Sequence, residues 1–332
     1  MNFPTRRQAL RLATATLAAS AFVCAAPAFA QGAYPAKPIT VVVSYPPGGD
    51  TDAIARLFAE KLGQRLKQPV VIENKPGAGG ALGNNYVSRA ANDGYTLLFT
   101  PNPFTTAPLV MKLSPSASYD VLHGFEPVIN TATQPLVLVA NPGLGVKSLP
   151  ELIAMAKSGK PVTYASPGAG SPMHIVGEWL NRAAGVKITH VPYRGVGPSV
   201  TDVVAGHVNT AWVTFGAVRQ YLQTGKLVPL AIGDAQRSRL APDVPTLKEL
   251  GYKDVVVGAW NGFFAPKGTP APIVKLLNEN LNEILKSPEV MEKLATFGAL
   301  PAGGAAEVLG KINASDYVVV GKVIQDLGIA AD

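Results

Sequence analysis

The stretch Ile39-Thr40-Val41-Val42-Val43-Ser44-Tyr45-Pro46-Pro47-Gly48-Gly49-Asp50-Thr51-Asp52 predicts a strand, a glycine turn and the start of a helix. Its first part is uncharged and β-branched, which is typical of a strand covered on both faces. The two prolines end the strand, and Gly48 and Gly49 let the backbone turn and approach a ligand closely. We expect Asp50 or Thr51 to cap the helix. Apolar residues then recur with helical spacing at Ile54, Leu57, Phe58 and Leu62.

A second unit of the same plan lies far along the chain. Residues 161–166 are a predicted strand, residues 167–170 (Pro-Gly-Ala-Gly) a turn, and Ser171-Pro172 a helix start with serine at the cap. Free amide groups in the first turn of each helix would point to the carboxyl edge of its sheet, where open parallel sheets bind ligands. Two such units predict two lobes that share a cleft. Glycine turns are common in α/β proteins, so neither loop alone establishes a function.

The N-terminus has the features of an export signal. Arg6, Arg7 and Arg11 precede an apolar run, residues 12–26, which is followed by Ala28-Phe29-Ala30. We expect cleavage after Ala30 and a periplasmic mature protein, with the Sec and twin-arginine routes both open. The single cysteine of the chain lies within this segment, so the mature protein is expected to have no disulfide and no thiolate chemistry.

Charge and length exclude several classes of protein. The net charge of the whole chain is +7, and the export segment supplies three of these charges. The remaining basic residues are scattered among acids, which argues against a nucleic-acid partner. No stretch after the signal approaches the length of a membrane span. A chain of 332 residues favours two domains.

Short strands alternate with helices along the rest of the chain, which is the pattern of an α/β protein. The apolar stretches 127–140 and 255–264 are expected to be crossovers between the lobes. We therefore predict two doubly wound sheets joined by a two-strand hinge, which can absorb a closing rotation. The predicted division is 1–30 signal peptide, 31–133 and 256–332 lobe 1, and 134–255 lobe 2.

Motifs for cofactors and catalysis are incomplete. The cluster of Gly77, Gly79 and Gly83 lacks the dinucleotide spacing, and the next strand ends at residues 100–103 without an acid for a ribose. The four histidines lack metal spacing. Ser171 and His174 could lie on one helical turn, but no third orienting acid is visible. We therefore expect no cofactor, no metal and no enzymatic activity.

Seven motifs in order resemble one family, the Bug-type extracytoplasmic solute receptors, which are the binding proteins of tripartite tricarboxylate transporters. These motifs are VSYPPGGDTD (43–52), ENKPGAGG (73–80), DGYTLL (93–98), YASPGAGS (164–171), HVPYRG (190–195), PDVPT (242–246) and APKGTP (265–270). The resemblance implies a type II, Venus-flytrap periplasmic binding protein that closes on a small carboxylate. It also implies a monomer that delivers its ligand to an inner-membrane permease. The alternatives are a ligand sensor for a membrane kinase and a secreted α/β enzyme acting on a small organic acid.

The resemblance also implies where the ligand would bind. One wall would run from Tyr45 to Thr51 and the other from Ser166 to His174, with two further residues beside the second. The implied ligand-binding residues are Tyr45, Pro47, Gly48, Gly49, Asp50, Thr51, Asn102, Ser166, Gly168, Gly170, Ser171, His174, Tyr193 and Arg194.

Two charged residues in these walls leave alternatives open. Relatives commonly carry a small neutral residue at the position of Asp50. Its carboxylate either caps its own helix or faces the cleft, where it would repel a purely anionic ligand and favour one with an amine, amide or protonated ring nitrogen. Arg194 either clamps a carboxylate through two hydrogen bonds or is a surface charge.

Overall fold

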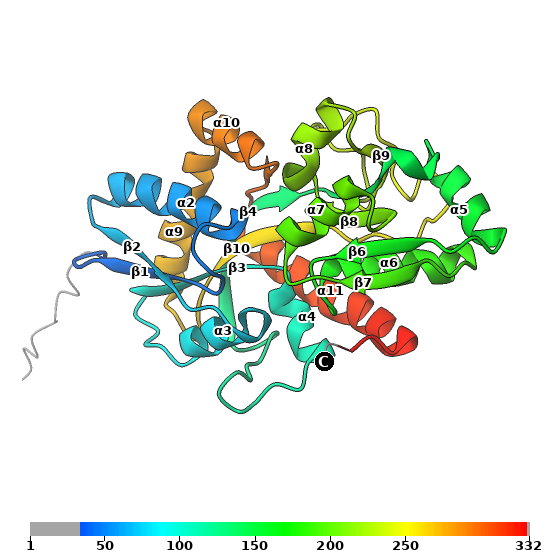
Figure 1. The fold of residues 1–332 in the computed structure, drawn as a ribbon. Helices are drawn as coiled ribbons and strands as arrows, with labels where there is room; N and C mark the ends of the chain where they lie inside the picture. The colour runs from blue at the N-terminus through cyan, green and yellow to red at the C-terminus, as the bar shows by residue number, and fades with distance from the viewer. Residues whose placement is uncertain (1–33, 331–332) are drawn as a thin grey trace, which may run out of the picture. The chain divides into compact units, whose positions relative to one another are not determined.

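The computed structural model describes residues 34–330. The predicted export signal, residues 1–30, lies outside the described residues. The chain divides into an N-terminal unit, Met1–Ala36, and a main unit, Lys37–Asp332. Every helix and strand of the described residues belongs to the main unit (Figure 1).

The first sheet has six strands in the order β11-β4-β10-β3-β1-β2. Strands β3, β1 and β2 run parallel, whereas β10 is antiparallel to both of its neighbours and β11 is antiparallel to β4. The strands are β1 (Ile39–Val43), β2 (Val70–Asn74), β3 (Thr96–Pro101), β4 (Phe125–Gln134), β10 (Ala259–Pro266) and β11 (Leu300–Pro301). Strand β10 therefore lies inside this sheet, although the whole second sheet precedes it in the sequence.

Helices cover both faces of the first sheet. Helices α2 and α9 contact each other on one face, and α3, α4 and α11 lie on the other (Figure 1). Their bounds are α2 (Asp50–Leu66), α3 (Ala81–Ser88), α4 (Pro103–Val110), α9 (Ala271–Leu285), α10 (Pro288–Thr296) and α11 (Ala306–Leu327), with the short turn η1 (Ala78–Gly80) before α3. We call this sheet and its helices the first half.

The second sheet has five strands in the order β7-β6-β8-β5-β9, and its strands are contiguous in sequence. They are β5 (Leu136–Ala140), β6 (Thr163–Ser166), β7 (Thr189–Pro192), β8 (Thr210–Thr214) and β9 (Val228–Ile232). One buried cluster packs α5 and α6 on this sheet, and another packs α7 and α8. These elements are η2 (Pro142–Leu144), α5 (Leu149–Lys157), α6 (Pro172–Ala184), α7 (Val196–Ala205) and α8 (Phe215–Gln223). Together they form the second half.

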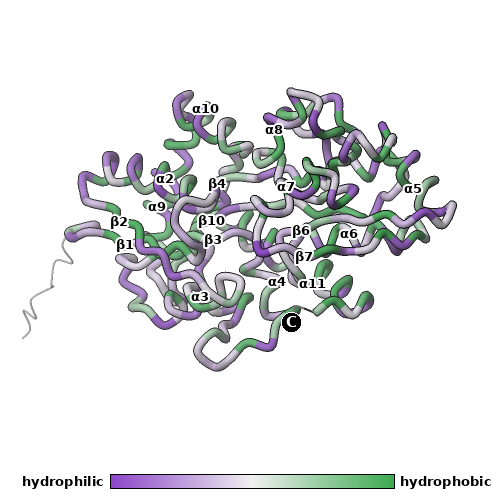
Figure 2. Tube along the Cα trace, in the orientation of Figure 1, coloured by the Kyte–Doolittle hydropathy of each residue, from purple (hydrophilic) through white to green (hydrophobic). Residues whose placement is uncertain are grey.

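The chain crosses between the halves twice. Strand β4 ends at Gln134 and β5 begins at Leu136, so one residue separates a strand of each sheet. The second crossover leads from the second half back to the first. It follows Val257, whose amide donates to the Gly233 carbonyl at 2.9 Å, and the chain enters β10 at Ala259. Hydrophobic residues follow the strands of both sheets, and hydrophilic residues lie on outward turns of helices such as α5 and α10 (Figure 2).

The halves also touch away from the crossovers. Gly298 and Gly216 approach so closely that a Cβ on Gly298 would lie 2.2 Å from the Gly216 Cα. Behind the sheets, Ile175 of α6 packs with Val320 and Ile324 of α11. Helix α11 thus contacts both halves. Among residues 34–330, none of the helices combines the length and the apolar composition that a membrane span requires.

Candidate functional site

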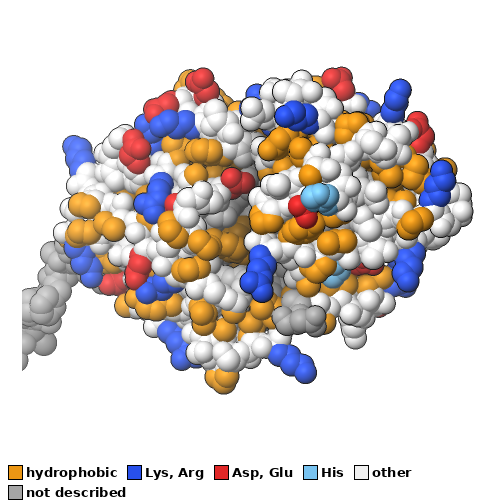
Figure 3. Space-filling view, viewed as in Figure 1, with side chains coloured by type: hydrophobic (Ala, Val, Ile, Leu, Met, Phe, Trp, Pro, Cys, Tyr) orange, Lys and Arg blue, Asp and Glu red, His pale blue; other side chains and the backbone are white. Residues whose placement is uncertain are grey.

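A cavity of about 840 Å³ lies between the two halves. Figure 3 shows the viewed face hollowed between them, with hydrophobic side chains inside the hollow. The first half contributes Tyr45, Pro46, Pro47, Gly49, Asp50, Thr51, Gly79, Pro101, Asn102, Pro103, Thr106, Ala107, Val110, Met111, Gln134 and Ala259. The second half contributes Pro167, Gly168, Ala169, Gly170, Ser171, Pro172, Met173, Gly195, Val196, Gly197, Val200, Thr201, Thr214, Ala217 and Tyr221.

Five helices begin at this cavity, because the N-cap residues of α2, α4, α6, α7 and α8 all line it. These N-cap residues are Gly49, Asn102, Ser171, Gly195 and Thr214. Among them only Ser171 makes a side-chain cap; the other four helices have none. Amide groups in the first turn of an uncapped helix lack intrahelical partners and carry partial positive charge. The cavity wall therefore offers several backbone donors to an anion.

A buried acid at the start of α2 holds the first wall, residues 45–51. Asp52 accepts hydrogen bonds from the Gly48 amide, the Arg56 Nε and the Asn74 Nδ2, each at 2.9 Å. Burial alone would raise the pKa of Asp52, but these hydrogen bonds outweigh it and the pKa lies below its usual value. An ionised Asp52 thus fixes the glycine turn to the helix and to β2.

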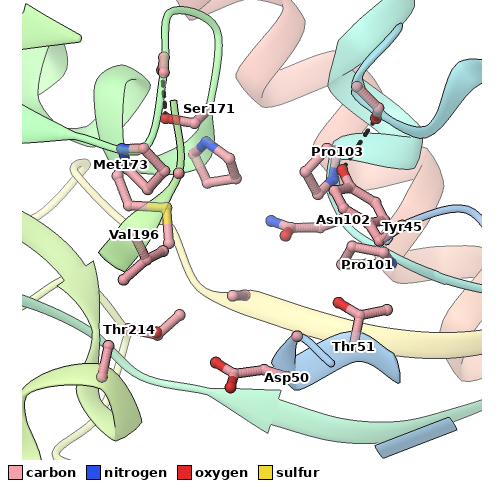
Figure 4. Close-up of a pocket in the computed structure, with 18 of the residues that line it drawn as sticks. Tyr45, Asp50, Thr51, Pro101, Asn102, Pro103, Ser171, Met173, Val196 and Thr214 are labelled. Atoms are coloured by element: carbon pink, nitrogen blue, oxygen red, sulfur yellow. Dashed lines mark hydrogen bonds between the residues drawn. The ribbon is translucent and has the colours of Figure 1, made fainter. Parts of the chain in front are cut away.

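The predicted helix cap at Asp50 or Thr51 is wrong. Gly49 is the N-cap, with extended backbone (φ −85°, ψ 171°), and Asp50 is already the first helical residue. A cap must have a non-helical backbone, so Asp50 is free to point into the cavity, on the side of Thr214 (Figure 4). Asp50 is exposed in this structure, but the surrounding walls remove part of its hydration and raise its pKa, and the nearby Gln134 side chain opposes that rise.

The second wall, residues 166–174, is braced by its own helix start. Ser171 Oγ donates to the Gly168 carbonyl at 2.7 Å and accepts from the His174 amide at 3.2 Å. The Gly170 amide donates to His174 Nδ1 at 3.0 Å, so this nitrogen carries no proton. Gly168 and Gly170 have φ of +152° and +72°, which favour glycine.

Two stacked histidines lie beneath this wall. The ring centroids of His174 and His190 are 3.9 Å apart with an interplanar angle of 10°, and Tyr164 stacks on His190 at 4.9 Å. His190 Nε2 lies 2.6 Å from Ser166 Oγ. Burial lowers the pKa of both histidines, that of His190 to about 4 with a further contribution from His174. Both rings are therefore neutral near pH 7.

Nine of the fourteen residues expected in the site line the cavity, and they come from both halves. They are Tyr45, Pro47, Gly49, Asp50, Thr51, Asn102, Gly168, Gly170 and Ser171. Gly48, Ser166, His174, Tyr193 and Arg194 are not part of the lining. Ser166 and His174 are buried behind the wall. Tyr193 donates to Asp202 at 2.6 Å, and Arg194 is exposed. Ligand contact by these five residues stays a prediction.

Several lining residues were not anticipated from the sequence. Gln134 and Ala259 come from the crossovers, Thr214 from the end of β8, and Val196 and Gly197 from the start of α7. The Gly195-Val196-Gly197 sequence after a strand was a usable signal, because it repeats the plan of the other two walls. Nothing in the sequence marks Gln134 as a cavity residue, since it depends on where the two sheets meet.

The described lining contains no lysine, arginine or histidine, and Asp50 is its only charged residue. No group of three or more His, Cys, Asp or Glu side chains among residues 34–330 could hold a metal ion. The arrangement can therefore bind an anion through backbone amides and hydroxyl groups rather than through a cation.

Comparison with known proteins places the chain in a family. Residues 54–329 match the model of the tripartite tricarboxylate transporter family receptor. The protein BugT of Bordetella pertussis (strain Tohama I) is 43% identical over 272 residues, which cover 81% of this chain and 82% of BugT. The solved structure of the periplasmic binding protein BugD has a TM-score of 0.75 and 32% identity, and covers 90% of this chain and 100% of that one.

Two similar structures contain ligands. MatC from Rhodopseudomonas palustris, with bound malate, is 34% identical with a TM-score of 0.74 and covers 88% of this chain and 100% of MatC. Rpa4515 of R. palustris, with adipate, is 32% identical with a TM-score of 0.78 and covers 90% of this chain and 99% of that one.

Two α/β sheets, two crossovers and a cavity between the halves define a periplasmic binding protein fold of type II, as the sequence predicted. The chain belongs to the tripartite tricarboxylate transporter receptor family, the family that its seven motifs indicated. It is therefore a solute receptor.

Proposed function

We propose that this receptor binds a small solute with at least one carboxylate between its halves and presents it to an inner-membrane permease of the tripartite tricarboxylate type. The observation that carries the proposal is the convergence of five helix N-termini, four of them uncapped, on a cavity whose described lining has no cationic side chain. Each helix end stabilises an anion by about 0.3–1 kcal/mol, and by more when partly buried.

The proposal also assigns the moving parts. Residues 31–133 and 256–332 act as one lobe and residues 134–255 as the other, and the crossovers near Pro135 and Gly258 absorb the closing rotation. The nine predicted residues that line the cavity contact the solute, and Gly48, Ser166 and His174 support the walls through their hydrogen bonds. Closure brings the amide groups of both walls onto the same carboxylate.

In this proposal the protein is a periplasmic monomer that returns its ligand unchanged. Its relatives support the assignment, because BugD is a periplasmic binding protein and two similar proteins hold malate and adipate, which are small carboxylates. The incomplete catalytic motifs agree with binding rather than turnover. An enzyme acting on the same acids would convert a tightly bound compound, and mass spectrometry of the recovered ligand distinguishes the two.

The test is a titration of the protein with small carboxylates and with their neutral amide analogues. We expect micromolar or tighter binding only for compounds that keep a carboxylate. Val196 lines the cavity at the first position of α7. The substitution Val196→Asp places a negative charge at that helix start, and we expect it to weaken carboxylate binding by about tenfold or more.

The matched control for this substitution is Val196→Asn, which has nearly the same shape as the aspartate but no charge. It should bind carboxylates within about threefold of the unmodified protein. Equal losses in both variants would mean that shape rather than charge matters at this helix start. Amide analogues that bind as tightly as their parent acids would contradict the proposed function itself.

A further inference from the structure

The described lining of the cavity carries a negative charge and no positive one. Asp50 is the only charged residue of the described lining, and it is negative. No ion pair joins it to a cation among the described residues. When the halves close, a carboxylate without a counter-charge loses its hydration at a considerable cost in free energy. The ligand is therefore expected to bring a group that interacts favourably with the Asp50 carboxylate and offsets that cost.

Asp50 is exposed in this structure, and it lines the cavity together with the polar side chain of Gln134; we call this part of the lining the floor of the cavity. Gln134, at the end of β4, accepts a hydrogen bond from Asn261 Nδ2 at 3.1 Å, which directs its own amide nitrogen away from Asn261. That amide nitrogen donates to the Phe297 carbonyl at 3.5 Å, and the nearby Gln134 side chain lowers the pKa of Asp50. Thr214 is also close to this floor, because its neighbour Phe215 donates its amide to the Pro135 carbonyl at 2.9 Å.

The hydroxyl group of Thr214 is buried and makes no hydrogen bond within the part of the chain that the structure describes. The side chain is 6% exposed and lines the cavity, and its Oγ1 has no hydrogen-bond partner among the described residues. Figure 4 shows Thr214 and Asp50 on the same side of the cavity, away from Ser171. A buried hydroxyl without a partner costs free energy, so it marks a place where a ligand group is expected. A carboxylate and a hydroxyl oxygen together accept hydrogen bonds from a nitrogen.

We propose that the solute is an amino acid in the broad sense, with a carboxylate held by the helix N-termini and a protonated nitrogen held by Asp50 and Thr214. This proposal rests on the proposed function, because it assumes the carboxylate site. The second anionic group of a dicarboxylate would instead meet Asp50 at this floor and be repelled.

The walls between the two ends are apolar. Val110 at the end of α4 and Met111 directly after it line the cavity, as do Met173 and Val196 from the second half. In Figure 4 the Met173 and Val196 side chains lie between Ser171 and Thr214. Methionine adapts its shape to the group packed against it. The ligand therefore carries its carboxylate and its nitrogen at opposite ends of an apolar chain or ring.

The test compares pairs of acids with equal chain length by isothermal titration. The pairs are γ-aminobutyrate with succinate, δ-aminovalerate with glutarate, and ε-aminocaproate with adipate. We expect the amino acid of the best-binding pair to bind about tenfold or more tightly than the dicarboxylate. In the nearly isosteric variant Asp50→Asn this preference should disappear or reverse. The control Asp243→Asn removes an exposed acid outside the cavity and should keep the original preference.

Each other outcome overturns the inference in a recognisable way. A dicarboxylate that binds as tightly as its amino acid partner would overturn the role of Asp50 but leave the carboxylate receptor intact. An unchanged preference in Asp50→Asn would do the same. Binding of none of these acids would overturn both proposals. Thermal unfolding of each variant shows whether a lost preference reflects a lost fold.

Discussion

The two main walls of the cavity share one plan but are held in different ways. In the first wall, residues 45–51, the helix is uncapped, an ionised Asp52 fixes the turn, and Asp50 faces the cavity. In the second wall, residues 166–174, Ser171 caps the helix, and the neutral rings of His174 and His190 stack behind the wall. The same strand, turn and helix can therefore present a charge or only amide groups, depending on the first helical residue and its support.

The largest effect is expected from removing the support of the first wall. Asp52→Ala removes a buried carboxylate that accepts hydrogen bonds from the Gly48 amide, the Arg56 Nε and the Asn74 Nδ2. We expect the free energy of unfolding to fall by about 3 kcal/mol, because hydrogen bonds to a charged group contribute more than hydrogen bonds between neutral groups. Urea unfolding measures the change, and ligand affinity should fall with it.

The control for this substitution lies on the same helix. Glu60 is exposed, so Glu60→Ala should change the free energy of unfolding by less than about 0.5 kcal/mol. If Asp52→Ala behaved like Glu60→Ala, the first wall would not depend on the buried acid. The contrast between the walls would then be lost.

A smaller effect is expected from acid, and it acts on the second wall first. Burial holds the pKa of His190 at about 4, below its ordinary value of 6.5, so the unfolded chain binds protons between these values while the folded chain does not. The free energy of unfolding should therefore fall as the pH drops from 6.5 toward 4, by about 2 kcal/mol. Protonation of His174 Nδ1 would also break its bond to the Gly170 amide.

The stabilisation of the first wall by ionised Asp52 is lost only at lower pH. The depressed pKa of Asp52 stabilises the fold above its unfolded pKa of 3.8, and this contribution is lost as the pH falls through the folded pKa. Buried acids such as Asp234 have raised pKa values and act in the opposite direction, so the measurement is a difference between the protein and His190→Gln. In His190→Gln the free energy of unfolding should change less with pH than in the original protein. Exposed His123→Gln is the control and should match the original protein.

The smallest effect concerns Arg194, which the sequence placed beside the second wall. The residue is exposed and lies outside the cavity lining. We expect Arg194→Ala to change ligand affinity by less than about twofold, as for a solvated surface charge. A loss of about tenfold or more would show that Arg194 reaches the ligand on closure and that the second wall is charged after all.

The sequence predicted the elements of the fold and the location of both walls. The β-branched run of β1, the glycine turns and the cap at Ser171 act through local backbone preferences, which the sequence displays directly. The capping position of α2 was missed for a physical reason. Asp50 and Gly49 are both good N-cap residues. Asp52 favours Gly49 as the N-cap, because its carboxylate accepts a hydrogen bond from the amide of Gly48, four residues earlier.

The floor of the cavity could not be predicted. Gln134 and Thr214 lie far apart in the sequence and become neighbours only where β4 gives way to β5 and β8 pairs with β5. Likewise, the role of His174 in α6 depends on stacking with His190 from strand β7. Such positions result from tertiary packing, which leaves no periodic trace in either segment.

The placement of β10 inside the first sheet determines the order in which the molecule can be completed. Strands β5 to β9 are contiguous, so the second sheet has all its partners as soon as they have been synthesised. Strand β4 pairs with β10 and β11 alone, and both are made later. Until then the incomplete chain carries open strand edges on β3 and β4, the kind of surface that pairs with other chains. The sheet of the first half, although its first strands are made early, is therefore the last to be completed.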